Sequence, residues 1–199
     1  MAHRFQCLCG KLQGEIAQPA PALRAVCYCR ECQASAHLLG EPQRVLDPQG
    51  GTDIVAMQSS NVRLLAGQEW LACLSLSPRG LLRWYASCCR TPIANTPRDW
   101  KLPYAGMVHS CLERPQPIES SFPAVQLRVN TGSAHGPVPR GGKLSGMARL
   151  ARLMLRLLAA RARGRYRQTP FFDANGAPVA EVKVAGREAV AQARRAIGT

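Results

Sequence analysis

Residues 1–130 alternate between short apolar runs and turn-forming glycines and prolines, a pattern typical of β-strands. Residues 5–16 are predicted to form a hairpin, with Gly10 and Gly14 interrupting the apolar pattern. Further strands are predicted at 53–57, 62–65, 71–76 and 81–85, and one short helix near 31–38. The pattern therefore predicts a mainly β fold.

The remaining residues show helical periodicity. The run TGSAHGPVPRGG at 131–142 has the glycine and proline content of a linker. A helix is predicted over 144–163, a small hairpin around the Asn-Gly pair within 170–179, and a terminal helix over 187–197. We therefore expect a β-rich domain at 1–130, a linker at 131–142, and a C-terminal extension at 143–199 made of a basic helix, a hairpin and a helix.

The predicted helix at 144–163 is amphipathic. Its apolar positions recur at helical spacing and are Leu144, Met147, Ala151, Met154, Leu155 and Leu158. Arginines line another side, at Arg149, Arg152, Arg156 and Arg163. The simplest expectation is that the apolar side packs on the β-domain and the arginines are solvated.

Composition is that of a folded protein, with 46% hydrophobic and 19% charged residues in 199. The start of the chain, MAHRFQCLCG, lacks the apolar segment of a secretory signal. No stretch reaches the roughly 18 uninterrupted apolar residues of a membrane span. These features predict a cytoplasmic protein without a transmembrane segment.

Nine cysteines are unexpected in a reducing compartment, where clustered thiols more often bind metal or carry redox chemistry than form disulfides. Seven fall in three tight groups. Only Cys73 and Cys111 stand alone, and these two are expected to be small buried hydrophobes.

The stretch AVCYCRECQ places Cys27, Cys29 and Cys32 in a C-x-C-x-x-C arrangement. Zinc prefers thiolates in tetrahedral geometry, and three protein ligands leave the fourth position open, as in reactive rather than structural sites. Two alternatives remain: a redox pair formed by Cys29 and Cys32, and thiols that are simply buried and inert. We favour the metal site.

A second site is predicted from Cys7, Cys9, Cys88 and Cys89, which gives one or two zinc ions in total. Vicinal cysteines are awkward ligands for one ion, because consecutive side chains on a strand point to opposite faces. They can share an ion only if the backbone turns at that point.

Positive charge is the other feature to explain. The net charge is +14, and nine of the 26 basic residues lie between Arg140 and Arg167, a segment without acidic residues. Such a helix can contact nucleic acid or an anionic membrane surface through Arg149, Arg152 and Arg156.

The order C-x-C-G, C-x-C-x-x-C and a distal cysteine pair resembles the glutathione-dependent formaldehyde-activating enzyme family, which includes the centromere protein V relatives. The matching segments are Cys7-Leu8-Cys9-Gly10, Cys27-Tyr28-Cys29-Arg30-Glu31-Cys32-Gln33, Cys89-Arg90-Thr91-Pro92 and Tyr104-Ala105-Gly106-Met107-Val108-His109. The resemblance covers roughly residues 1 to 115. It departs from the family pattern at Ala86 and Arg90, which stand where a cysteine and a glycine are usual.

The resemblance implies a zinc-stabilised multi-sheet fold of the formaldehyde-activating-enzyme type. It also implies a structural site formed by the first C-x-C and the distal pair, and an open site formed by Cys27, Cys29 and Cys32. The implied activity is that of a carbon–sulfur lyase acting on a glutathione–aldehyde adduct, with zinc as Lewis acid.

Two functions follow as hypotheses. The first is such a lyase, with His109 as a candidate proton carrier and Arg24 and Arg30 suited to an anionic tripeptide. The alternative is a non-catalytic zinc-stabilised binding module that uses its basic helix to contact nucleic acid, an anionic membrane surface or a protein partner.

Overall fold

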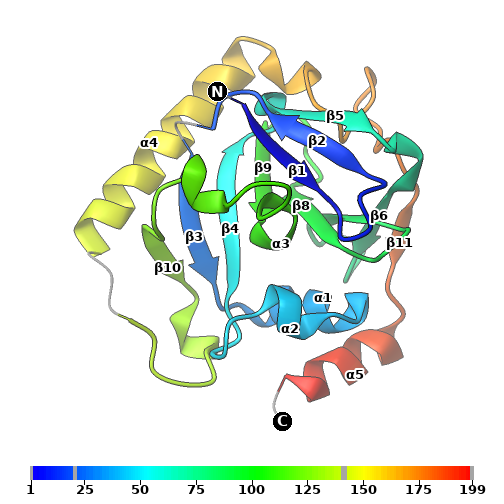
Figure 1. Ribbon diagram of the computed structural model, residues 1–199, viewed down its shortest axis with the longest axis vertical. Coiled ribbons are helices and arrows are strands. Elements are labelled where there is room, and N and C mark those ends of the chain that lie inside the picture. The colour runs from blue at the N-terminus through cyan, green and yellow to red at the C-terminus, as the bar shows by residue number, and fades with distance from the viewer. Residues whose placement is uncertain (1, 20–21, 140–142, 198–199) are drawn as a thin grey trace.

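A computed structural model of the chain describes residues 2–19, 22–139 and 143–197 (Figure 1). In this part of the chain the fold is mainly β, with two sheets and a few helices, as the sequence predicted. No helix among the described residues is both long enough and apolar enough to cross a bilayer.

The smaller sheet has three antiparallel strands in the order β1 (His3–Gln6), β2 (Gln13–Ile16) and β5 (Val62–Ala66). The first two strands form the predicted hairpin, and Phe5 lies opposite Gly14. A Cβ atom at Gly14 would lie 2.3 Å from the Phe5 ring, so only glycine leaves room for this aromatic side chain. The tight pairing holds the loop that carries Cys7 and Cys9.

The larger sheet has eight strands in the order β10-β3-β4-β9-β8-β7-β6-β11. Its strands are β3 (Leu23–Cys27), β4 (Thr52–Gln58), β6 (Leu71–Ser75), β7 (Leu82–Ala86), β8 (Pro92–Thr96), β9 (Tyr104–Val108), β10 (Leu127–Val129) and β11 (Val182–Val184). The six inner strands pair antiparallel, whereas the short edge strands β10 and β11 pair parallel to β3 and β6. Strands β3, β8, β9, β10 and β11 were not predicted individually.

The main core joins the two sheets. Phe5 and Ile16 of the small sheet belong to the same buried cluster as Trp84 and Met107 of the large one. Phe171 packs against Trp84 with ring centroids 5.2 Å apart, so a residue from late in the chain completes this core.

The helices are α1 (Arg30–Leu39), α2 (Pro42–Val45), α3 (His109–Leu112), α4 (Lys143–Ala162) and α5 (Arg187–Ala196). Short 3-10 turns lie at Ser59–Asn61, Gln68–Trp70, Ile118–Ser120, Thr131–Ser133 and Arg165–Arg167. Helices α1, α4 and α5 match predicted helices. The predicted hairpin at 170–179 is reduced to a turn with a single bridge between Phe172 and Pro178.

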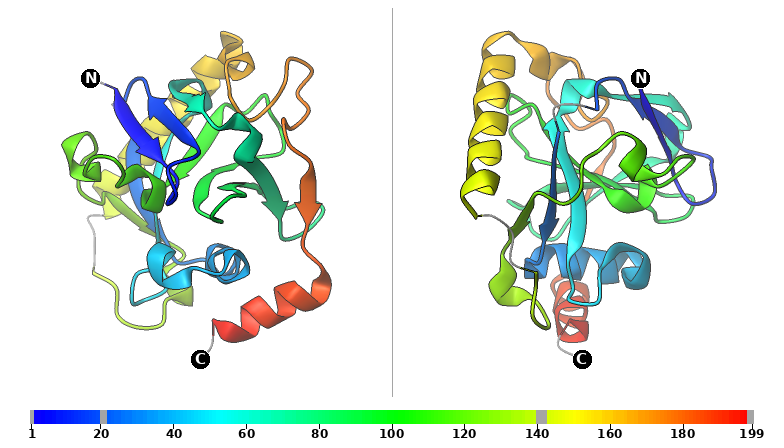
Figure 2. Two further views of the ribbon diagram at one scale, coloured as in Figure 1. Left: turned by 45° about the vertical axis from the view of Figure 1, so that its right-hand side comes forward. Right: turned by 60° about the vertical axis from the view of Figure 1, so that its left-hand side comes forward.

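Helix α4 lies along the outside of the large sheet, against β3, β4 and β10 (Figure 2). Its buried positions are Leu153, Leu157 and Ala160, with Leu150 partly buried beside them. The stripe expected to pack instead faces outward: Met147, Met154, Leu155 and Leu158 are all exposed, and the side chain of Leu144 is outside the described part. That expectation was wrong because α4 carries two apolar stripes of the same period.

The C-terminal elements contact the N-terminal ones. Strand β11 pairs with β6, and α5 packs on α1 through Val190, Ala193 and Ile197. The division of the chain at 130 and 143 stays a prediction, and residues 140–142 of the expected linker lie outside the described residues.

Candidate metal centres

The first cysteine group unites two loops that are about 80 residues apart in the sequence. Cys7 and Cys9 come from the β1–β2 loop, and Cys88 and Cys89 from the turn after β7. The Sγ atom of Cys88 lies 3.8 Å from that of Cys7, 3.3 Å from that of Cys9 and 3.8 Å from that of Cys89. Four thiolates around zinc, each about 2.3 Å from the ion, are separated by roughly 3.8 Å. This group therefore has the donors and spacing to hold one metal ion with four thiolates.

The backbone turns at Cys88 and Cys89, as it must if both side chains are to bind one ion. The amide of Cys89 donates to the carbonyl of Ala86 at 3.4 Å, and the amide of Ala86 donates to the carbonyl of Thr91 at 2.9 Å. Arg90 closes the turn with a left-handed φ of 58°, a backbone conformation that glycine adopts more readily than arginine. Cys88, rather than Ala86, supplies the fourth thiol.

The side chain of Arg90 links this turn to the helix of the second cysteine group. Its guanidinium donates to the carbonyl of Leu38 at 2.6 Å, in the last turn of α1. On the other side, Thr91 Oγ1 accepts from the amide of Leu8 at 3.0 Å and lies 3.1 Å from the Cys89 Sγ. The two loops of the four-thiol group are thus tied together by the protein itself.

Burial and hydrogen bonding give the thiols of this group different pKa values. Burial raises the pKa of Cys7. Burial would also raise the pKa of Cys89, but hydrogen bonds, first of all from the Thr91 hydroxyl, outweigh it and lower the pKa to about 6. Cys89 therefore supplies a thiolate more readily than Cys7.

The second cysteine group lies where β3 ends and α1 begins. The Sγ atoms of Cys27, Cys29 and Cys32 all lie within 4.8 Å of one another. Cys29 caps α1, because its Sγ accepts from the backbone N–H of Cys32 at 3.4 Å. The positive end of α1 therefore lies at this group and favours a negative charge on the group as a whole. Within the described residues, no histidine, aspartate, glutamate or further cysteine joins this group as a fourth ligand.

These three thiols share their protons unequally. Hydrogen bonds from Cys29 and Cys32 lower the pKa of Cys27 to about 2, helped by a bond from Asn130. The same bonds raise the pKa of Cys29 and of Cys32. The group therefore carries one negative charge readily and resists losing further protons until a cation is present.

Polar side chains from other strands surround the three-thiol group. Asn130, just after β10 and with a left-handed φ of 56°, donates to the Cys27 Sγ at 3.3 Å. Arg83 of β7 is 5% exposed, lies 3.9 Å from the Cys32 Sγ and donates to Asn95 Oδ1 at 3.2 Å. Sequence reasoning missed these residues, although an arginine inside the apolar run Leu81-Leu82-Arg83-Trp84-Tyr85 was a signal.

A cavity of about 580 Å³ opens onto this group, within the range of small-molecule sites. Its walls combine apolar side chains, among them Ile54, Leu81 and Val129, with Arg79 and Tyr104. Burial, and then the charges of Cys32 and Cys27, raise the pKa of Tyr104 to about 12, so its phenol keeps its proton at neutral pH.

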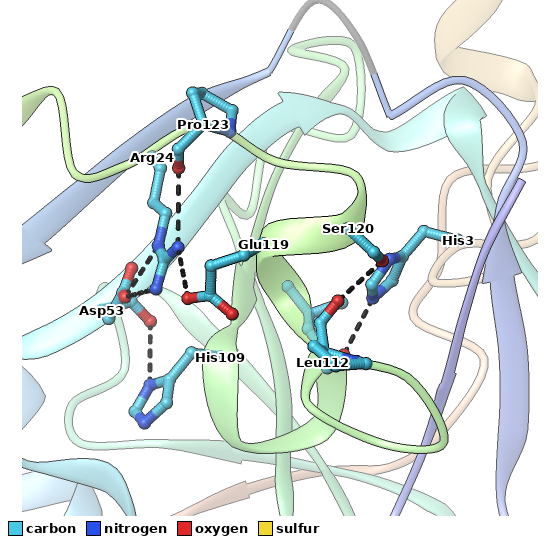
Figure 3. Close-up of polar contacts among 9 residues, drawn as sticks. His3, Arg24, Asp53, His109, Leu112, Glu119, Ser120 and Pro123 are labelled. Atoms are coloured by element: carbon cyan, nitrogen blue, oxygen red, sulfur yellow. Dashed lines mark hydrogen bonds and ion pairs between the residues drawn. The ribbon is translucent and has the colours of Figure 1, made fainter. Parts of the chain in front are cut away.

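His109 does not line this cavity. It lies at the start of α3, where its Nδ1 is 3.2 Å from the carbonyl oxygen of Asp53 (Figure 3). It lines a separate cavity of about 360 Å³, together with Cys89, Arg44 and Glu113. The structure thus places the predicted proton carrier beside the four-thiol group.

Arg24 is not available to an anionic substrate, contrary to expectation. Its side chain is 9% exposed and pairs with Asp53 at 2.8 Å and with Glu119 at 3.1 Å (Figure 3). Both partners hold the guanidinium inside the protein, where it links β3 and β4 to the segment after α3. Arg30 is exposed on α1.

The remaining residues singled out in the sequence fall into two sets. Cys73 and Cys111 are fully buried, as expected of isolated thiols. Arg149, Arg152 and Arg156 are all exposed on α4.

Residues 2–183 match the model of a family of unknown function (DUF6151). No curated protein matches the chain. Among solved structures, a Rhodobacter sphaeroides protein described as a structural genomics target is 18% identical, with a TM-score of 0.42, over 63% of this chain and 99% of its own.

Proposed function

The chain belongs to the DUF6151 family, and from the geometry of its thiols we propose that it is a zinc protein with one closed and one open site. The open site, at Cys27, Cys29 and Cys32, is proposed to act on a carbon–sulfur adduct of a small thiol such as glutathione. This is the activity implied by the resemblance to the formaldehyde-activating enzymes.

One observation carries the proposal. Four thiols gather in one group and three in the other, and the group of three adjoins a cavity of about 580 Å³. A site with three protein ligands keeps a coordination position for substrate, whereas a site with four is structural. The chemistry that zinc supplies in an open site is Lewis-acid activation of a bound sulfur or oxygen.

The protein's own residues bind and orient the adduct in this proposal. Arg79 lies in the wall of the cavity and suits a carboxylate of the thiol compound. Arg83 and Asn130 direct N–H groups at the sulfurs of Cys32 and Cys27 and so fix the ligand sulfurs in place. Tyr104 lines the same cavity, where its phenol can donate a hydrogen bond to the adduct, whereas His109 lines a different cavity.

Metal content tests the proposal. Protein purified without chelator or added zinc is expected to hold one zinc ion in each of the two groups. Cys29→Ser should lose the ion of the open site and remain folded. Cys9→Ser should lose the other ion and unfold at lower urea concentration, because a structural zinc contributes directly to folding. Cys73→Ala, a buried thiol outside both groups, is the control and should keep both ions.

Activity is tested on the same set of proteins. Formation or breakdown of S-hydroxymethylglutathione, followed by NMR, should be faster with the zinc-loaded protein and slow to the background rate in Cys29→Ser. Protein without zinc and with disulfides among these cysteines would disprove the metal sites. Full zinc content without turnover of any thiol adduct would disprove the lyase and leave the metal sites standing.

A further inference from the structure

Helix α4 exposes a continuous apolar stripe to solvent. Met147, Met154, Leu155 and Leu158 are 58%, 43%, 66% and 55% exposed, and Ala151 completes the stripe. Their spacing of four, three, one and three residues places them on one side of a helix with 3.6 residues per turn. None of the described residues covers them. Single exposed leucines are ordinary on protein surfaces, but a stripe along three turns is not.

This stripe is separate from the one that packs on the sheet. At about 100° per residue, it is centred roughly a third of a turn around the helix from Leu153 and Leu157. Helix α4 therefore has one apolar side for the core and a second that points away from it. The right-hand view of Figure 2 shows α4 along the edge of the molecule, with its whole outer side free of other elements.

Arginines border the exposed stripe. Arg149, Arg152 and Arg156 are exposed on α4, on the flank beyond Leu155, and Arg163 is exposed just after the helix ends. No acidic residue occurs in the sequence between Glu119 and Asp173. Only Arg161 has an acidic partner on the described surface nearby, at 3.2 Å from Asp99. The outer side of α4 thus presents apolar and cationic groups next to each other.

We propose that the outer side of α4 docks on an anionic lipid bilayer, with the helix lying in the plane of the membrane surface. Apolar side chains of such a helix enter the boundary between headgroups and acyl chains, while the arginines contact anionic headgroups. A nucleic acid offers phosphates to the arginines but no apolar surface to Leu155 and Leu158. Helix α4 of a second copy offers apolar side chains but no acidic residue to the arginines. This inference does not depend on the metal centres.

Vesicle binding tests the proposal on the full, zinc-loaded chain. The protein should co-sediment with vesicles of equal parts phosphatidylcholine and phosphatidylglycerol, and not with phosphatidylcholine alone. The double variant Leu155→Gln, Leu158→Gln should bind about tenfold more weakly or worse, since it removes two apolar side chains from the lipid. Both positions are exposed, so its unfolding midpoint should stay that of the parent protein.

Charge is tested by a matched pair of triple variants. Changing Arg149, Arg152 and Arg156 to glutamine should weaken binding on the order of a hundredfold, at about 1 kcal/mol per arginine. Changing Arg4, Arg114 and Arg187 to glutamine removes the same charge from exposed positions outside α4. This second variant should lose much less vesicle affinity.

Three results would overturn the proposal. Equal losses in the two triple variants would mean general charge attraction. If the leucine double variant binds vesicles as well as the parent protein does, and if the parent binds duplex DNA while the α4 arginine triple variant does not, the ligand is nucleic acid. A dimer in sedimentation velocity that the leucine double variant dissolves would indicate a second copy.

Discussion

Asp53→Asn is expected to destabilise the protein strongly, because it leaves a buried charge without its nearest partner. The Arg24 guanidinium donates to Asp53 Oδ2 from Nε at 2.9 Å and lies 2.8 Å away through Nη2. The other oxygen, Oδ1, has no hydrogen-bond partner among the described residues. Asparagine therefore keeps the shape of the side chain and breaks no other bond, so the substitution isolates the ion pair.

The magnitude follows from burial. The side chains of Arg24 and Asp53 are 9% and 17% exposed, and removing one member of a buried pair costs about 3–5 kcal/mol. Glu119 remains 3.1 Å from Arg24 and compensates in part, so we expect a value near the lower limit, about 3 kcal/mol. For a chain of this length that lowers the melting temperature by about 6–12 °C.

Glu119→Gln is the matched control. It removes the other carboxylate from Arg24, but this side chain is 67% exposed and solvent screens the pair. Thermal and urea unfolding of both variants, with metal content measured alongside, compares the two carboxylates directly. Equal losses of stability would refute the argument from burial. Unchanged stability with lost binding of glutathione would instead restore Arg24 as a substrate residue.

Three further predictions test other parts of the structure. His3 is buried, its Nε2 donates to the Leu112 carbonyl at 2.8 Å and its Nδ1 accepts from Gln116 at 2.9 Å, so it is neutral when folded. Burial lowers the pKa of His3, so the unfolded chain binds the proton first and the free energy of unfolding should fall as pH drops below about 6.5. Urea unfolding midpoints measured at neutral pH and below about pH 6.5 should fall less in His3→Gln than in the parent protein. Leu157→Ala, at a position 1% exposed, should cost about 3 kcal/mol in urea unfolding, whereas Leu158→Ala, 55% exposed, should change stability by less than about 0.5 kcal/mol; equal costs would contradict the orientation of α4. Gly176→Ala should lower the melting temperature, because φ is +86° and the new Cβ would lie 2.3 Å from the Trp100 ring; an unchanged melting temperature would contradict this turn.

Local patterns predicted a good part of this fold. The hairpin at 5–16, strands β4 to β7, and helices α1, α4 and α5 all follow from periodicity and turn residues within a short window. The group of Cys27, Cys29 and Cys32 also followed, because C-x-C and C-x-x-C spacings bring sulfurs together within a single loop or helical turn, whereas Cys7 and Cys9 meet Cys88 and Cys89 only in the folded chain.

Features that depend on distant pairing could not be predicted. Nothing near Leu127 or Val182 in the sequence indicates a parallel partner about 100 residues away. The burial of Arg24 depends on Asp53 and Glu119, which only the folded chain brings together. Periodicity alone also could not decide which of the two apolar stripes of α4 faces the sheet, since both repeat with the helical period.

The parallel edge strands have a consequence for how the chain is made. Strands β3 and β6 emerge early during synthesis, but the segments that cover their outer edges, β10 and β11, follow about 100 residues later. Until then each strand presents a row of unpaired backbone groups, which can template association with another nascent chain. Fragments that end before β11 should therefore aggregate through β6 even when their core has formed.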